Sequence, residues 1–159
     1  MKRFLLLFLA TVVTAWSASA QLSVSQLRTE HLTDPVGIGE RRPLLSWEVS
    51  DASRRGVTQS AYEIRVKSGG RTVWRTGKVA SAESAGVFYD GTPLTSDTRY
   101  TWQVRVWDDR GKASAWSRPA FWRTGLFDVG EWQARWIEPA VSDELAAMFR
   151  RTFRVTKPV

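Results

Sequence analysis

The chain has 159 residues, a formal net charge of +7 and no cysteine, which excludes a disulfide framework and thiolate chemistry. Hydrophobic residues make up 43% of it, and its nine tryptophans can bury enough apolar area for the core of one ordinary domain. Because the cations are dispersed, with no run of five or more, the sequence does not predict nucleic-acid binding.

The first 20 residues have the order of a secretory signal peptide. The basic pair Lys2-Arg3 precedes an apolar run at 4–13, and residues 18–20 are small, as a signal peptidase requires. A membrane anchor is the weaker alternative, because the run is well short of the roughly 20 residues that span a bilayer. We therefore expect export to the periplasm or the exterior, with cleavage after Ala20 leaving no membrane segment.

Seven short segments follow in which apolar and polar residues alternate as they do in strands. Between them lie turn clusters rich in Gly, Pro, Asp and Ser. The segments are 22–27, 44–49, 61–67, 72–76, 86–89, 100–106 and 121–124. Seven antiparallel strands in about 100 residues is the expected size of an immunoglobulin-like sandwich. We predict an all-β, immunoglobulin- or fibronectin type III-like antiparallel β-sandwich over residues 21–126.

The stretch 94–122 is the most informative part of this prediction. Its alternation puts Tyr100, Trp102, Val104 and Val106 on one face of a strand. The polar turn 108–111 then leads into a second strand that ends near Trp122. A hairpin this apolar on one face requires an opposing sheet, so the stretch favours a sandwich.

Residues 127–159 have a different pattern and are predicted to be a linker followed by the first strand or strands of a second, incomplete β-sandwich. Segment 147–155 resembles a strand with Phe149, Arg151 and Phe153 on one face, and a short helical periodicity appears only at 144–148. A lone strand pair is marginal in water. The segment therefore either packs on the first domain or begins another one, and its apolar side chains favour the second alternative.

Candidate catalytic and metal-binding groups are few. Acids lie in pairs at Glu30 with Asp34, at 108–109 and at 143–144, and His31 is the only histidine. Aspartate is favoured in turns for its own backbone hydrogen bonds, and a metal site needs more ligands at close spacing. We therefore predict no catalytic residue, no metal site and no cofactor.

The tryptophans are the remaining candidates, because exposed aromatic rings can stack on sugars. Trp47 and Trp102 occupy core positions. Trp107 breaks the alternation and faces outward, Trp74 lies in a short edge-like strand, and Trp116 lies in the loop after the hairpin turn. Trp74, Trp107 and Trp116 are predicted either to pack against another domain or cap a strand end, or to bind a sugar, and the first two roles are favoured.

Two family resemblances rest on these residues. Trp47, the strand 62–66 and the approach to Tyr100 at 94–100 resemble a fibronectin type III domain with its tyrosine corner. More specifically, the chain resembles the N-terminal region of bacterial α-L-rhamnosidases. The segments that carry this second resemblance are LRTEHLTDPVGI at 27–38, RPLLSW at 42–47, TRYTWQVRVWD at 98–108, SAWS at 114–117, WQARWI at 132–137 and FRRTF at 149–153.

The resemblance implies a non-catalytic accessory role. Members of the family hydrolyse terminal α-L-rhamnosides with inversion, using acidic residues of a downstream helical barrel, and no residue of this chain matches them. The implied partners are the downstream β-sandwich and barrel of the parent enzyme, together with rhamnose-containing glycans. The alternative from another class is a free-standing secreted carbohydrate-binding or protein-interaction module, and a structural spacer in a different polysaccharide-degrading enzyme is a third.

Overall fold

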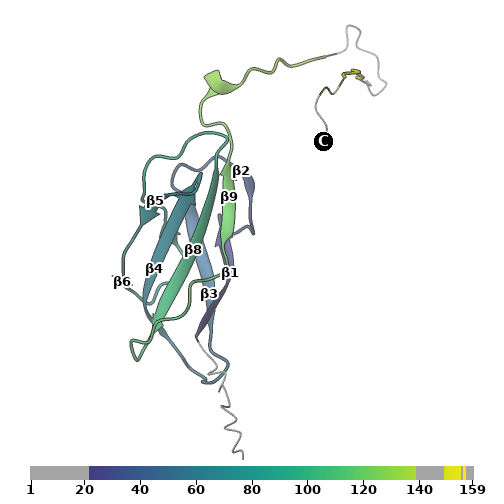
Figure 1. Ribbon diagram of the computed structural model, residues 1–159. Helices are drawn as coiled ribbons and strands as arrows, with labels where there is room; N and C mark the ends of the chain where they lie inside the picture. Colours follow the sequence, from purple (N-terminus) through teal and green to yellow (C-terminus); the bar gives the residue numbers. More distant parts are fainter. Residues whose placement is uncertain (1–21, 139–148, 155, 157–159) are drawn as a thin grey trace, which may run out of the picture. The chain divides into compact units, whose positions relative to one another are not determined.

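The computed structural model describes residues 22–138, 149–154 and 156, and its strands form a two-layered β-sandwich (Figure 1). The smaller sheet has the order β1-β3-β7, with bounds Ser23–Thr29, Leu44–Ser50 and Val87–Phe88. The larger sheet has the order β2-β9-β8-β4-β5, and β6 also pairs with β4. Its strands are β2 (Val36–Ile38), β4 (Gln59–Ser68), β5 (Arg71–Arg75), β6 (Val79–Ala80), β8 (Arg99–Asp108) and β9 (Ala120–Thr124).

The predicted all-β sandwich is confirmed, and each of the seven predicted segments overlaps one of its strands. Two further strands, β2 and β6, were not predicted. In the segment Val36–Ile38, Gly37 has a φ of 80°, and three residues are too few to show an alternation. It pairs in parallel with β9, through Val36 with Arg123 and Ile38 with Thr124, so this one pair departs from the antiparallel arrangement.

The core lies between the inward faces of the two sheets. Along β8 every second residue is buried, and Tyr100, Trp102, Val104 and Val106 are each at most 3% exposed. Trp47 on β3 faces them from the other sheet and is equally buried. Burying side chains of this size supplies the main stabilisation of a domain that has no disulfide.

Some buried polar groups of the core have partners, whereas Thr29 Oγ1, Trp102 Nε1 and Trp122 Nε1 have none among the described residues. The Trp47 Nε1–H donates to Gln59 Oε1 at 3.0 Å. The Tyr100 hydroxyl accepts a hydrogen bond from the backbone N–H of Thr95 at 2.9 Å, five residues upstream. This contact confirms the tyrosine corner expected from the sequence, and it joins β8 to the connection that precedes it.

The segment that returns from β8 to β9 is irregular over residues 113–119. Side-chain hydrogen bonds hold this segment to β8. The Ser114 hydroxyl accepts from the Val106 amide at 3.0 Å, and the Ser117 hydroxyl accepts from the Val104 amide at 3.1 Å. Their own amides donate to the carbonyls of the same two valines, at 2.8 and 2.9 Å. The predicted hairpin is therefore present, but regular pairing resumes only at Trp102 with Ala120.

The chain divides into two units, with the boundary between Phe127 and Asp128. In the second unit, the described residues form one short helical turn, η1 (Val129–Glu131), and no strand. The described part of the strand predicted at 147–155, residues 149–154, is not assigned as a strand, and the second, incomplete sandwich stays a prediction. Phe149 and Phe153 are exposed there, and none of the described strands pairs with this segment.

The predicted signal peptide, the acids at 143–144 and the helical periodicity at 144–148 lie outside the described residues. Within the described ranges, no helix has the length and apolar character needed to cross a membrane.

Candidate functional site

The outward face of the larger sheet carries a row of alternating aromatic rings and cations. We call this row the ladder and define it as Arg65, Trp116, Arg105, Trp107 and Lys78. The Arg65 guanidinium lies 4.2 Å from the centre of the Trp116 ring, and Arg105 lies 4.9 Å from Trp116 and 5.0 Å from Trp107. The Lys78 ammonium completes the row, 4.8 Å from Trp107. Each contact is within the range of a cation–π interaction.

The ladder is anchored to the sheet by a buried carboxylate. Glu63 on β4 is 2% exposed, and its two oxygens accept from Arg75 Nε at 2.6 Å and Arg105 Nε at 2.8 Å. Burial acts to raise the pKa of Glu63, but the hydrogen bonds from Arg75 and Arg105 outweigh it and hold the pKa below its usual value of 4.5. Glu63 is therefore an ionised acid whose partners come from two neighbouring strands.

A second set of bonds fixes the other end of the ladder. Gln103 Oε1 accepts from Arg65 Nε at 3.1 Å and from Arg65 Nη2 at 2.8 Å. The amide nitrogen of the same Gln103 side chain donates to the Ser117 carbonyl at 2.7 Å. Gln103 therefore ties Arg65 on β4 to the loop that presents Trp116.

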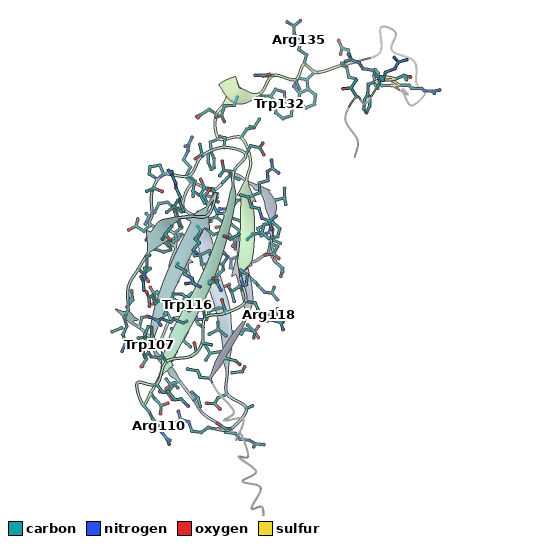
Figure 2. The ribbon with its side chains drawn as sticks, in the orientation of Figure 1. Trp107, Arg110, Trp116, Arg118, Trp132 and Arg135 are labelled. Carbon is teal, nitrogen blue, oxygen red and sulfur yellow. The ribbon has the colours of Figure 1, made fainter. Side chains whose placement is uncertain are left out.

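The structure brings together two of the three predicted tryptophans. Figure 2 shows Trp107 and Trp116 close to each other along β8, where both belong to the ladder. Trp74 lies elsewhere: on β5, half-buried, it meets Tyr89 edge-on with 5.0 Å between ring centres. Because two cations contact each ladder ring, a sugar that stacks on Trp107 or Trp116 would have to displace one of them. Contact of these tryptophans with sugar or another domain stays a prediction.

The acids singled out in the sequence bind the backbone. Glu30 Oε1 accepts from the Leu44 amide at 2.6 Å, and Asp34 Oδ1 accepts from the Phe121 amide at 2.8 Å. Asp108 Oδ1 accepts from the amides of Arg110 and Lys112 in the turn after β8. Exposed His31 has a φ of 63° in the turn after β1. Within the described part of the chain, no three His, Cys, Asp or Glu side chains group as metal ligands would.

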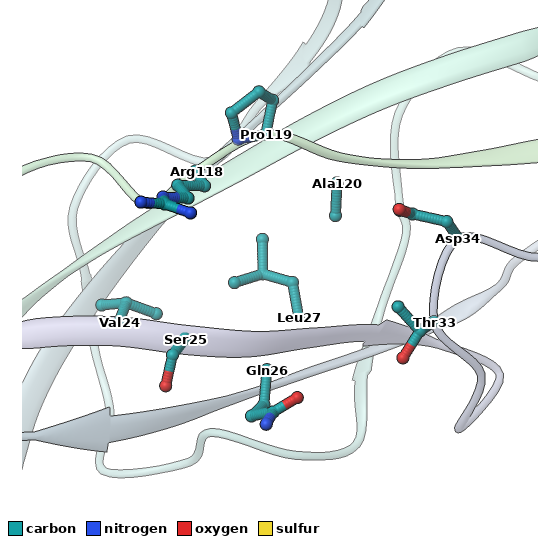
Figure 3. Close-up of a pocket in the computed structure, with 9 residues that line it drawn as sticks. All are labelled: Val24, Ser25, Gln26, Leu27, Thr33, Asp34, Arg118, Pro119 and Ala120. Carbon is teal, nitrogen blue, oxygen red and sulfur yellow. The ribbon is translucent and has the colours of Figure 1, made fainter.

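A groove of about 590 Å³ runs along one edge of the sandwich, between β1 and residues 118–120 (Figure 3). Figure 3 shows Leu27 pointing from β1 toward this segment. Asp34, at one end of the groove, is the one carboxylate among the residues that line it. The register of β1 against β3 shifts between Ser25 and Arg28, and Gln26 in this bulge has a φ of 49°. Such a bulge twists an edge strand away from further pairing. The groove therefore has neither paired acids nor a regular strand edge to offer.

The sequence did not single out the ladder cations Arg65 and Arg105, nor Gln103 and Glu63, which hold them in place. A signal for them exists in the sequence. Each occupies an outward position of a strand whose inward positions were predicted, and Arg105 directly precedes the Val106-Trp107 pair.

The fold defines this protein as an immunoglobulin-like β-sandwich domain. More specifically, the chain belongs to the family described as Rha78A-like, N-terminal immunoglobulin domain, whose model matches residues 24–128. The resemblance to the N-terminal region of α-L-rhamnosidases is therefore confirmed.

The chain is similar to several α-L-rhamnosidases. It is 44% identical over 121 residues to an α-L-rhamnosidase of Streptomyces avermitilis, a match that covers 73% of this chain and 12% of that enzyme. A solved S. avermitilis α-L-rhamnosidase, complexed with L-rhamnose, superposes with a TM-score of 0.71 and 43% identity over 75% of this chain and 12% of that one. The α-L-rhamnosidase of Dictyoglumus thermophilum gives a TM-score of 0.68 and 33% identity over 73% of this chain and 14% of that one. The matched region is thus 12% to 14% of these relatives.

Proposed function

We propose that this chain is the non-catalytic N-terminal accessory portion of an exported α-L-rhamnosidase. A downstream β-sandwich and catalytic barrel would supply the inverting hydrolysis of terminal α-L-rhamnosides. The observation that carries the proposal is the match of residues 24–128 to an N-terminal domain, within a region that makes up only 12% to 14% of the related enzymes.

The acidic side chains support a non-catalytic role. Inverting glycoside hydrolysis needs two carboxyl groups about 6.5–9.5 Å apart, with room for a water molecule between them and the sugar. Glu30, Asp34 and Asp108 instead accept hydrogen bonds from backbone amides, and Glu63 is enclosed by two arginines. Each of these acids has a structural task that would be lost if it were used in catalysis.

The second unit supports contact with further domains of a parent enzyme. Trp132, Trp136 and Ile137 expose 57%, 95% and 69% of their surface. Exposed apolar side chains that lie close together in sequence are typical of surfaces that another domain covers. We infer that the downstream β-sandwich packs against them, so that the N-terminal domain is held in a fixed place and supports the barrel.

The accessory role is tested by assaying the purified chain with an aryl α-L-rhamnoside. We expect no release of rhamnose above the uncatalysed rate, whereas an active α-L-rhamnosidase in the same assay provides the positive control. Release that scales with the concentration of the chain would refute the proposal. The reading frame beyond the Val159 codon separates the two classes of function: a continuing frame that encodes a barrel supports the accessory role, and a stop codon supports a free-standing module.

Export is tested separately, by mass spectrometry of the protein recovered outside the cytoplasm of expressing cells. We expect the mature chain to begin at Gln21. Exported material that still begins at Met1 would contradict cleavage, and full retention in the cytoplasm would contradict export.

A further inference from the structure

Cations that are far apart in the sequence lie close together on the folded sheet. Strand register places Arg65 opposite Arg75, and Arg99 opposite Arg123, on the outward face of the larger sheet. Among the outward-facing residues of β4, β5, β8 and β9, the one carboxylate is Glu63. The cations on the same face of these four strands are Arg65, Lys67, Arg75, Arg99, Arg105 and Arg123.

Like charges directly opposite each other across two strands are destabilising. Glu63 offsets this repulsion at one edge of the face through Arg75 and Arg105, and Asp97 does so for Arg123 at 2.7 Å. These two carboxylates leave the face with a strong excess of positive charge. An anionic ligand that bridges the arginines would relieve the remaining repulsion.

Several of these guanidinium groups are held in place before any ligand arrives. Arg99 lies 3.8 Å from the centre of the Phe121 ring, and Arg65 is held between the Trp116 ring and Gln103. A planar guanidinium fixed in this way can offer two parallel N–H donors to one carboxylate. Because its rotamer is already selected, binding costs less conformational entropy.

We propose that this cationic face binds a polysaccharide that carries carboxylate groups, such as a chain of uronic acids. The choice of a polysaccharide as the source of the carboxylates rests on the proposed function. The chemistry of the face itself is independent of that function, because it is set by the positions of the arginines.

Two observations favour a polysaccharide over other polyanions. The core of a protein–protein interface is apolar. Among the described residues, however, none of the large exposed hydrophobic side chains belongs to β4, β5, β8 or β9. Proteins that bind single-stranded nucleic acids offer uncovered aromatic rings for bases to stack on. Here the rings of Trp107, Trp116 and Phe121 are all contacted by cations.

The test is a calorimetric titration of the full chain with polygalacturonate at low ionic strength, beside a neutral galactan. The test variant is Lys67→Gln/Arg99→Gln, which removes two charges from the face without touching the ladder. The matched control is Arg55→Gln/Arg110→Gln, which removes two exposed charges elsewhere; Arg110 lies in the turn after β8 (Figure 2). Circular dichroism checks that both variants are folded.

We expect polygalacturonate to bind, the galactan not to bind, and the affinity to fall as the ionic strength is raised. The test variant should bind about fivefold more weakly than the wild type, and the control should bind within twofold of it. If polygalacturonate fails to bind, or if both variants lose affinity equally, the proposal is overturned. Tighter binding of oligo-dT or polyglutamate than of polygalacturonate would overturn it in favour of a nucleic acid or an acidic protein. None of these results alters the outcome of the rhamnoside assay, so the two proposals fail separately.

Discussion

The guanidinium of Arg105 stacks on the ring of Trp116, with 4.9 Å between the guanidinium carbon and the ring centre. Arg105 lies on β8, whereas Trp116 lies in the irregular loop that follows it, so the contact fastens this loop to the sheet. The same guanidinium reaches Glu63 with its Nη2, at 2.6 Å. One side chain therefore joins two strands and a loop.

Replacement of Arg105 by leucine is expected to lower the free energy of unfolding by about 2–4 kcal/mol. The change removes two ring contacts and leaves the buried Glu63 with Arg75 as its one remaining ion-pair partner. The measurement is urea denaturation followed by tryptophan fluorescence. Arg118→Leu, at an exposed position in the groove, is the control and should cost less than about 0.5 kcal/mol. Equal losses in the two variants would show that Arg105 is not the centre of the ladder.

Glu63 makes part of the stability dependent on pH. Its pKa is held below 4.5 in the folded state, so its contribution is present above that value and is lost as the pH falls through the lower, folded pKa. Glu63→Gln should therefore melt at a lower temperature than the wild type near pH 7. The difference should narrow as the pH is lowered to about 3.

The control for this pH series is Asp90→Asn, which removes an acid from an exposed ion pair with Arg42. Its effect on the melting temperature should be small at every pH, since exposed pairs contribute little. A gap between wild type and Glu63→Gln that stays constant across the series would contradict the ionic role of Glu63.

Much of the sandwich could be predicted because each inward face follows from alternation within one strand. The shared inward face of Tyr100, Trp102, Val104 and Val106 could be predicted from the sequence of β8 alone. The ladder could not be predicted in this way, because it depends on which residues stand opposite each other on different strands. The pairing of Glu63 with Arg105 is set by the register of β4 against β8. The register is a property of the two paired strands, so the alternation within either strand does not reveal it.

The parallel strand β2 was missed for a related reason. Three residues around Gly37 are too few to show an alternation, and their pairing with β9 joins segments about 85 residues apart in the chain. The strand predicted at 147–155 rests on alternation alone. Alternation alone does not make a strand without a partner to pair with, and residues 149–154 are exposed and have no regular secondary structure.

Tyr100→Phe is expected to cost about 1–2 kcal/mol of folding free energy more than Tyr62→Phe. Both rings are buried. The Tyr100 hydroxyl accepts a hydrogen bond from the Thr95 amide, whereas the Tyr62 hydroxyl makes no hydrogen bond within the described residues. Removing the acceptor leaves a polar backbone group without its partner. Chemical denaturation of the two variants gives the comparison. A cost for Tyr62→Phe as large as that for Tyr100→Phe would show that the corner hydrogen bond adds no stability.

Gly91 lies where no side chain fits. A Cβ atom there would lie 2.6 Å from the Cβ of Trp74 and 2.5 Å from the hydroxyl oxygen of Tyr89, so Gly91→Ala must displace both rings. We expect it to lower stability by about 1–3 kcal/mol, measured as a shift in the denaturation midpoint. Gly39→Ala, at a position with open space around it, should change the midpoint little. Equal behaviour of the two variants would contradict the close packing around Gly91.

The pairing of β9 on both sides has a mechanical consequence. β9 is the last strand before the chain leaves the sandwich, and it is bonded to β8 along one edge and to β2 along the other. A pulling force on the chain beyond Gly125 must therefore break two rows of hydrogen bonds together, rather than peel one strand from an open edge. The sandwich should therefore resist unfolding when the chain is pulled at its exit from β9 more strongly than it would if β9 were paired along one edge alone.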